Sequence, residues 1–305
     1  MFSAKSIKAS EIKNLDTIKI IKDGSFSYIT KLESHLENRL VPCTLEKHIK
    51  ISNKIKNISG LIVPPSLMGL VDDSKFLLVS DDPLESAFRI HEEISKIDNF
   101  QWKNFKTEIH PSSEISEHAY ISSSNVKIGK NVKIFDNVVI HDRCIIEDDC
   151  IIGANTVLGC NAFQVFKQRN KPQIIISQSG GVKIHKGVEI QSNCTVSKAI
   201  FGGFTEIGSE TLIDSQVHIG HDCLIGKKVL IANQSSIAGR VFIEDGAYLA
   251  PNTTISNGIR IGANSKITLG STVISDVAKD TTVTGFGALD HKEWMRQRIM
   301  QLRKK

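Results

Sequence analysis

Aliphatic side chains recur at every sixth residue along most of the chain. The longest run passes through twelve positions without a slip: Ile207, Ile213, Ile219, Ile225, Ile231, Ile237, Ile243, Leu249, Ile255, Ile261, Ile267 and Val273. Two earlier runs keep the same step apart from one extra residue after Ile121: Ile109, Ile115, Ile121, Ile128, Ile134, Ile140, Ile146, Ile152 and Leu158, then Ile184, Ile190 and Val196. A repeat this regular has to be explained before any local motif, because it determines the architecture.

Neither a helix nor an ordinary strand produces a step of six. A helix places apolar residues three, four and seven apart, and a half-buried strand alternates over several residues before an irregular turn. A short strand followed by a tight corner fits, with one aliphatic side chain facing inward per repeat. Small or β-branched residues two positions earlier are expected to fill a second inward slot: Thr205, Thr211, Val217, Cys223, Val229, Ser235, Val241 and Ala247. The small residues after the aliphatics are expected to form the bends: Gly208, Gly220, Gly226, Ala232 and Ala238.

Three such repeats make a triangular coil of eighteen residues that stacks on the next coil through parallel ladders. In this pattern the sequence resembles the hexapeptide-repeat acyltransferases. The resemblance implies a left-handed winding, since ordinary parallel crossovers are right-handed. We therefore predict a mainly β protein built on a left-handed parallel β-helix, with a small N-terminal α/β domain and a short C-terminal helix. Four cysteines in the second inward slot are expected to be core residues: Cys144, Cys150, Cys194 and Cys223.

The repeat also divides the chain. Residues 1–106 lack it and mix strand-like and helical patterns, so we expect a small α/β domain there, with a helix starting at Asp82 and Pro83. Residues 107–288 form the predicted β-helix, from which residues 159–183 loop outward. Residues 289–305 read as a basic helix, with Asp290 and Glu293 in a capping-box pattern.

That helix carries an apolar stripe, which we expect to pack on a partner subunit or on the end of the coil: Trp294, Met295, Ile299 and Leu302. From His291 to Lys305 the chain also holds six basic residues against one acid, a net +5 that equals the charge of the whole chain. A balanced body argues against a nucleic-acid face, whereas a basic tail suits a local acidic partner. The chain shows no signal-peptide or transmembrane pattern and no CxxC pair, so we expect a cytoplasmic protein.

Two histidines interrupt the pattern in "VHIGHDCLIG", residues 217–226. His218 precedes the inward Ile219 and should point outward, while His221 falls at a corner. Gly239 lies eighteen residues after His221, so stacking should bring it about 4.8 Å away. An imidazole beside an exposed glycine N–H provides a base and an oxyanion donor, the two groups that acyl transfer needs.

Longer segments resemble one family closely. "LIDSQVHIGHDCLIG", "IAGRVFIEDGAYLAPNTTISNGIRIG" and "DGSFSYITKLESHLENRL" are similar to the UDP-3-O-acylglucosamine N-acyltransferases of the lipid A pathway. The resemblance covers nearly the whole chain and implies a homotrimer in which His221 is the general base and Gly239 binds the oxyanion. It also implies that residues 1–106 form a nucleotide-binding-like domain. Substrate contacts are implied for Tyr28, which would stack on uracil, and for the residues at Lys31 and His218.

The chain departs from that family at defined positions. Lys31 stands where the family has asparagine, Ser34 replaces a second aromatic residue, and a second active-site histidine falls on Gly258. The C-terminal region is also shortened. These changes leave the identity of the amino sugar and of the acyl donor open.

The predicted reaction moves an acyl group from a thioester to the amine of a nucleotide-linked amino sugar, with Asp214 orienting His221. No tightly bound cofactor is expected. The donor would be the 4'-phosphopantetheine thioester of acyl carrier protein, an acidic partner for the basic tail, or a coenzyme A thioester.

Two alternatives remain. One is an acetyl-CoA-dependent N-acetyltransferase of nucleotide amino sugars for surface polysaccharide. The other is a zinc enzyme using His218 and His221, although zinc catalysis wants three ligands and no third histidine stands nearby in the repeat. We therefore predict no metal.

Overall fold

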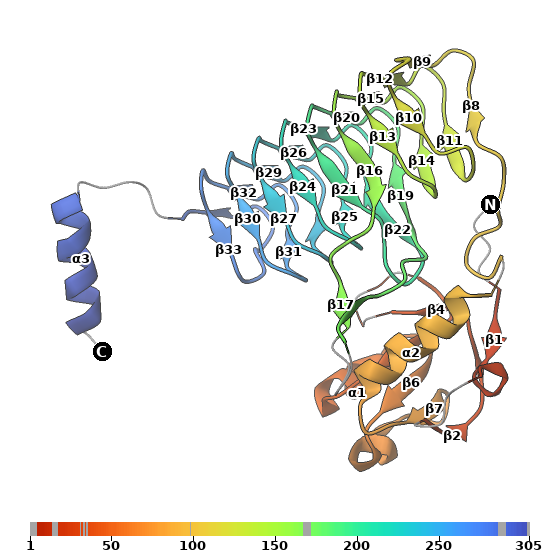
Figure 1. Cartoon of the computed structure of the whole chain (residues 1–305). Coiled ribbons are helices and arrows are strands. Elements are labelled where there is room, and N and C mark those ends of the chain that lie inside the picture. Colours follow the sequence, from red (N-terminus) through yellow and green to blue (C-terminus); the bar gives the residue numbers. More distant parts are fainter. Residues whose placement is uncertain are drawn as a thin grey trace.

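The computed structural model describes residues 5–13, 18–30, 32, 34, 36–97, 99–166, 172–285 and 291–303. It contains a long prism of short strands, with a smaller α/β domain beside its middle coils and helix α3 (His291–Arg303) at the far end of the chain (Figure 1). The prism is the parallel β-helix that the six-residue step predicts, with the left-handed winding that the family resemblance implies.

Three parallel sheets of eight, eight and nine strands form the faces of the prism. The first face consists of β10 (Tyr120–Ile121), β13 (Val139–Ile140), β16 (Val157–Cys160), β21 (Thr195–Ser197), β24 (His218–Ile219), β27 (Ser236–Ile237), β30 (Thr254–Ile255) and β33 (Thr272–Val273). The second consists of β8 (Glu108–Ile109), β11 (Val126–Ile128), β14 (Cys144–Ile146), β19 (Gly181–Ile184), β22 (Phe204–Ile207), β25 (Leu224–Ile225), β28 (Phe242–Ile243) and β31 (Arg260–Ile261). The third consists of β9 (Glu114–Ile115), β12 (Lys133–Ile134), β15 (Ile151–Ile152), β20 (Glu189–Ile190), β23 (Leu212–Ile213), β26 (Leu230–Ile231), β29 (Tyr248–Leu249), β32 (Lys266–Ile267) and β34 (Thr282–Val283).

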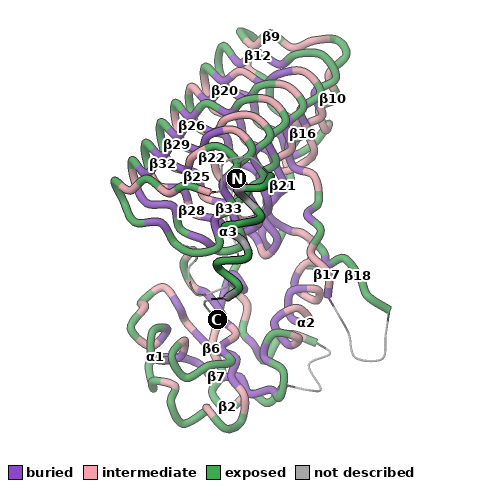
Figure 2. Tube along the Cα trace, turned by 90° about the vertical axis from the view of Figure 1, so that its left-hand side faces the viewer, coloured by how far each residue is buried: buried purple, intermediate pink, exposed green. Residues whose placement is uncertain are grey.

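The interior of the prism is filled as the sequence predicts. From Ile128 to Val273 every aliphatic residue of the six-residue step is buried, and so is every residue predicted for the second inward slot. Figure 2 shows this as a buried lining along the inside of the coils. Only the first coil departs, where Ile109 is exposed because no further coil covers that end.

The bends are not where the small residues suggested. Positive φ angles occur three residues after most of the aliphatics, for example 57° at Asp222 and 62° at Arg240. Gly220 has no positive φ, but a Cβ there would stand 2.6 Å from the nitrogen of Gly239 in the next coil. The small residue is therefore required by the close approach of stacked coils, and the turn itself lies further on.

Two excursions leave the coil. The first contains an antiparallel hairpin of β17 (Val165–Phe166) and β18 (Ile174–Ile175), within the segment predicted to loop outward. The second runs between β21 and β22, where the aliphatic step lengthens to eleven residues from Val196 to Ile207. The sequence analysis overlooked this second excursion, although the lengthened step was visible.

The α/β domain contains a five-stranded sheet in the order β2 (Lys19–Lys22), β7 (Phe76–Val79), β6 (Ile58–Val63), β5 (Arg39–Pro42) and β4 (Tyr28–Ile29). Its other elements are β1 (Ile7–Lys8), η1 (Ala9–Glu11), β3 (Ser25–Phe26), α1 (Glu46–Lys54), η2 (Pro65–Leu70) and α2 (Pro83–Ser95). Helix α2 begins where predicted, because the Asp82 side chain accepts a hydrogen bond from Glu85 N at 2.9 Å.

Helix α2 ties this domain to the coil through both excursions. His91 Nε2 lies 2.9 Å from the carbonyl oxygen of Ser177, and the Glu92 carboxylate accepts bonds from Ser177 N at 2.7 Å and Oγ at 2.9 Å. An apolar cluster closes the junction: Phe88, Phe166, Ile176, Ile200 and Phe201. The domain is thereby held over one edge of the prism.

Helix α3 leaves its apolar stripe uncovered in the single chain. Met295, Ile299 and Leu302 are exposed, so the predicted packing on the end of the coil is not seen. Asp290 and the side chains of Glu293 and Trp294 lie outside the described residues. No helix in the described part of the chain is both long and apolar enough to cross a membrane.

Candidate functional site

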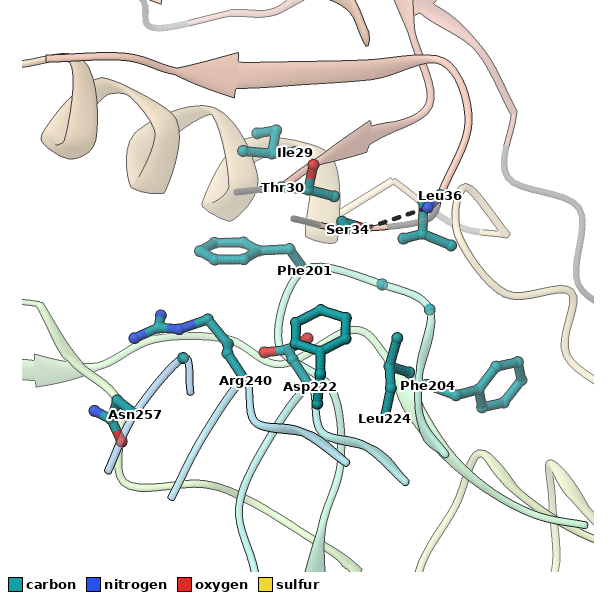
Figure 3. Close-up of a pocket in the computed structure, with 14 residues that line it drawn as sticks. Ile29, Thr30, Ser34, Leu36, Phe201, Phe204, Asp222, Leu224, Arg240 and Asn257 are labelled. Atoms are coloured by element: carbon teal, nitrogen blue, oxygen red, sulfur yellow. Dashed lines mark hydrogen bonds between the residues drawn. The ribbon is translucent and has the colours of Figure 1, made fainter. Parts of the chain in front are cut away.

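A cavity of about 240 Å³ lies between the α/β domain and one edge of the prism (Figure 3). Three parts of the chain line it: Ile29, Thr30, Ser34 and Leu36 from the α/β domain; Phe201, Gly202, Gly203 and Phe204 from the second excursion; and Asp222, Leu224, Arg240, Phe242, Asn257 and Gly258 from three successive coils. Asp222 and Arg240 directly follow His221 and Gly239 in the sequence. The cavity therefore reaches the corner at which the sequence predicts chemistry.

His221 occupies the corner between β24 and β25, and only 8% of its surface is exposed. Its Nδ1 lies 2.7 Å from Oδ2 of Asp222. Asp222 is itself held in place, because its N–H donates to Thr205 Oγ1 at 2.9 Å and its Oδ1 accepts from Ile200 N at 3.2 Å. A carboxylate that accepts from Nδ1–H leaves Nε2 of a neutral imidazole free to accept a proton.

Gly239 lies against the imidazole, one coil further along. The pairing of His218 with Ser236 and of Ile219 with Ile237 sets this register. A Cβ on residue 239 would overlap Nε2 of His221, so only glycine fits beside the ring in this position. The neighbouring Arg240 N–H is bonded to His221 O at 2.7 Å, whereas the Gly239 N–H has no acceptor among the described residues.

The corner thus combines a buried imidazole, a carboxylate that orients it and an unpaired backbone donor. A base of this kind removes a proton from a nucleophile, and a free peptide N–H stabilises an oxyanion in a site that excludes most water. This is the equipment of acyl transfer.

The carboxylate at His221 is a correction to the sequence analysis, which chose Asp214. Asp214 is exposed and accepts a bond from its neighbour Ser215 N at 2.7 Å. It lines a separate groove on the third face, together with Leu212, Leu230 and Tyr248. Asp214 follows β23 and therefore lies at a different corner of the triangle, whereas Asp222 shares the corner of His221.

Of the predicted substrate contacts, His218 and Tyr28 lie among the described residues, and they lie in different parts of the structure. His218 lies on the outer surface of the first face, where desolvation and then the nearby His221 lower its pKa. Tyr28 is 8% exposed, and its ring packs beside Gly202, beneath the cavity lining rather than in it. Burial raises the pKa of Tyr28. Lys31 lies outside the described residues.

Several lining residues escaped the sequence analysis. Phe201 belongs to the second excursion and Phe204 begins β22 directly after it, and the lengthened aliphatic step could have pointed to them. Arg240 and Asn257 also had a signal in the sequence. Asn257 lies thirty-six residues after His221, and Arg240 lies one position past the residue eighteen after it, so both fall at corners stacked on His221.

The thiols near this corner and in earlier coils are kept protonated by burial. Cys223 is fully buried two residues after His221, and burial raises its pKa to about 12. Burial likewise raises the pKa of Cys150 to about 11. Among the described residues, no group of histidines, cysteines or carboxylates is arranged to hold a metal ion.

Comparisons with known proteins support the repeat. Residues 125–160 match the family described as bacterial transferase hexapeptide (six repeats), over coils that precede His221. The chain therefore carries the hexapeptide repeat of bacterial transferases. No curated protein sequence matches it.

Solved structures with similarity include two UDP-N-acetylglucosamine acyltransferases. That of Francisella novicida is 25% identical over 63% of this chain and 71% of its own, with a TM-score of 0.49. That of Campylobacter jejuni is 25% identical over 62% and 81%, with a TM-score of 0.43. A perosamine N-acetyltransferase from Caulobacter crescentus, solved with CoA and GDP-perosamine, is 16% identical over 75% and 67%, with a TM-score of 0.19.

Proposed function

We propose that this protein is an N-acyltransferase that moves an acyl group from a thioester to the amine of a nucleotide-linked amino sugar. One observation carries the proposal: the His221–Asp222 pair shares a corner with the unpaired N–H of Gly239, beside a cavity large enough to admit part of a substrate. The family resemblance noted in the sequence supports the choice of N-acylation of UDP-3-O-acylglucosamine in lipid A synthesis.

In the proposed reaction the amine nitrogen attacks the thioester carbonyl carbon, and His221 Nε2 accepts a proton from that nitrogen. The carbonyl oxygen becomes an oxyanion to which Gly239 N–H donates, an interaction worth roughly 2.7–4 kcal/mol in enzymes where it has been removed. Collapse of the tetrahedral intermediate breaks the carbon–sulfur bond. The imidazolium returns its proton to the departing sulfur, and Asp222 stabilises the imidazolium meanwhile.

The acceptor would enter the cavity between the two domains. Its walls are largely aromatic and aliphatic, through Phe201, Phe204, Leu224 and Phe242, with few polar groups. Such a surface suits a base or sugar ring. Since nucleotide sugars and acyl thioesters are made in the cytoplasm, we place the reaction there.

The donor would be acyl carrier protein, whose acidic surface complements the basic C-terminal helix. In a homotrimer the exposed Met295, Ile299 and Leu302 of that helix would be covered. The ladder of Leu212, Leu230 and Tyr248, paired in register on the third face, offers a further apolar contact between subunits.

A donor and acceptor screen tests the proposal. The purified protein is incubated with UDP-linked amino sugars that carry a free amine and with either long-chain acyl carrier protein or acetyl-CoA, and amide formation is followed by mass spectrometry. An acylated product that requires His221 is the expected result. If no amine acceptor is acylated with either donor while the protein is folded, the proposal fails.

The acetyl-CoA arm addresses a second candidate, a nucleotide amino sugar N-acetyltransferase. The observation in its favour is that Tyr28 lies beneath the cavity lining and Ser34 lines the cavity in place of an aromatic residue, so the contacts to a uracil differ from those of the resembled family. Turnover with acetyl-CoA and none with long-chain carrier would select this candidate.

A further inference from the structure

Arg240 brings a positive charge to the cavity lining. It is half-buried, occupies the corner directly after Gly239, and extends on the same side of the hollow as Asn257, beneath Phe201 (Figure 3). Within the described residues, no ion pair includes Arg240. The guanidinium therefore has no carboxylate within ion-pair distance in the described part of the chain, and the wall around it is largely apolar.

The acid closest along the stacked corners is already engaged. Asp222 stands one coil before Arg240 and uses both carboxylate oxygens, one for His221 Nδ1 and the other for Ile200 N. The remaining polar lining from the α/β domain, Thr30 and Ser34, is neutral. Asp222 is thus the one carboxylate of the described lining, and it makes no ion pair with Arg240, so the guanidinium is available to a negative group of a ligand.

The coil beyond Arg240 leaves room for such a ligand. Gly258 occupies the next stacked corner, and a Cβ added there would meet no atom within 4 Å. The absence of a side chain at this position opens space beside the guanidinium. Asn257, which precedes Gly258, adds an amide that donates hydrogen bonds.

We propose that Arg240, assisted by Asn257, binds the phosphate oxygens of a nucleoside diphosphate in this cavity. A guanidinium forms paired, charge-assisted hydrogen bonds with phosphate, and it does so most strongly where water is scarce. This inference rests on the proposed function, since it identifies the diphosphate as the part of the acceptor that Arg240 binds. Because Arg240 adjoins Gly239, the same contact positions the sugar end of the acceptor at the reacting corner.

Binding measurements test the inference without requiring turnover. The affinities of UDP, UMP and uridine for the full chain are measured by calorimetry, for the wild type and for Arg240→Gln and Arg240→Lys. We expect Arg240→Gln to weaken UDP about 10- to 100-fold, as loss of hydrogen bonds to a charged group does, and to leave uridine unchanged. Arg240→Lys should retain part of the affinity, since a lysine keeps the charge but not the paired geometry.

A matched control is available at Lys228. It is an exposed cation in the same backbone conformation, with φ of 55° at another corner, where it pairs with Glu210. Lys228→Gln should bind UDP as the wild type does. An equal loss in both variants would show a general charge effect and overturn the inference.

Further outcomes separate this inference from the proposed function. UDP affinity unchanged in Arg240→Gln, or uridine weakened as much as UDP, overturns the phosphate contact. A loss confined to a carboxylate-bearing sugar such as glucuronate, with UDP unaffected, overturns it in favour of a sugar acid. If UDP binding depends on Arg240 but no amine is acylated, the phosphate contact stands and the N-acyltransferase proposal fails. If an amine is acylated but UDP does not bind, the N-acyltransferase proposal stands and the phosphate contact is overturned.

Discussion

His221 and Gly239 are eighteen residues apart in the sequence and in contact in the prism, where the imidazole lies over the bare α-carbon of the glycine. Three repeats of six residues make one coil, so the contact is a direct consequence of the period. The same geometry leaves the Gly239 N–H without an acceptor in the described part of the chain, while its neighbours are bonded to adjacent coils.

Gly239→Ala should reduce turnover by about 100-fold or more, because the new methyl group would overlap His221 Nε2 and displace the ring from the donor N–H. Steady-state kinetics and thermal unfolding measure the effect. Gly69→Ala is the control, since a Cβ at Gly69 meets nothing within 4 Å and its φ is not positive. A fully active Gly239→Ala enzyme would show that this corner is not the reacting site.

The carboxylate that orients His221 is tested by a pair of substitutions. Asp222→Asn should lower kcat strongly, because an amide does not hold the imidazole in the tautomer that leaves Nε2 free. Asp214→Asn should leave kcat near the wild-type value, since Asp214 bonds to Ser215 N at another corner. The opposite ranking of the two variants would restore Asp214 to the role that the sequence suggested.

His221→Ala should abolish detectable turnover, as the loss of a general base typically costs about 10²- to 10⁴-fold. The variant should still assemble as the wild type does in sedimentation, because the truncated ring supports no ladder hydrogen bond. Substantial residual activity in a folded variant would remove His221 from the mechanism.

The junction between α2 and the first excursion should weaken in acid. Burial lowers the pKa of His91, whereas an unfolded histidine titrates near 6.5. The unfolded state therefore binds a proton that the folded state refuses, and stability decreases as the pH falls below about 6.5. We expect the wild type to lose about 1 kcal/mol more than His91→Gln between pH 7.5 and 5.5 in urea unfolding.

His218→Gln is the companion variant in that experiment, because desolvation lowers the pKa of His218 as well. Removing either histidine should flatten the acid limb of the stability profile. Parallel profiles for the wild type and both variants would mean that neither histidine is kept neutral by the fold.

The buried thiols should resist alkylation in the folded protein. Burial raises the pKa of Cys223 to about 12 and that of Cys150 to about 11, so almost no thiolate is present at pH 8. Iodoacetamide should leave both unmodified and the activity intact, with labelling only after denaturation, as read by mass spectrometry. Inactivation that tracks modification of Cys223 would contradict this.

Removing residues 296–305 tests the basic tail. We expect slower transfer from acyl carrier protein and a weaker dependence of that rate on salt, because electrostatic steering would be lost. Transfer from a coenzyme A thioester serves as the control and should change little. An unchanged rate with the carrier at low salt would exclude the tail from donor recognition.

The sequence by itself determined everything that follows from the six-residue step. Each inward position, the core role of Cys223 and the stacking of Gly239 on His221 depend only on neighbours six or eighteen residues away. A repeat conveys such contacts because every coil must match the one before it. The bends were predicted at the wrong residue because small residues follow the aliphatics where stacked coils approach closely. The residues with positive φ include Asn, Asp, Arg, Glu, Gln and Lys, so no single residue type marks the turn in the sequence.

Only the tertiary structure decided what surrounds the corner of His221 and Gly239. The choice of Asp222 over Asp214 depends on which corner each residue occupies, and the removal of Tyr28 from the cavity lining depends on how the second excursion packs beside it. The cavity itself exists because α2 docks on two excursions that have no period. Contacts between aperiodic segments far apart in the chain leave no pattern in the sequence, since the free energy of docking comes from surfaces that meet only after both parts have folded.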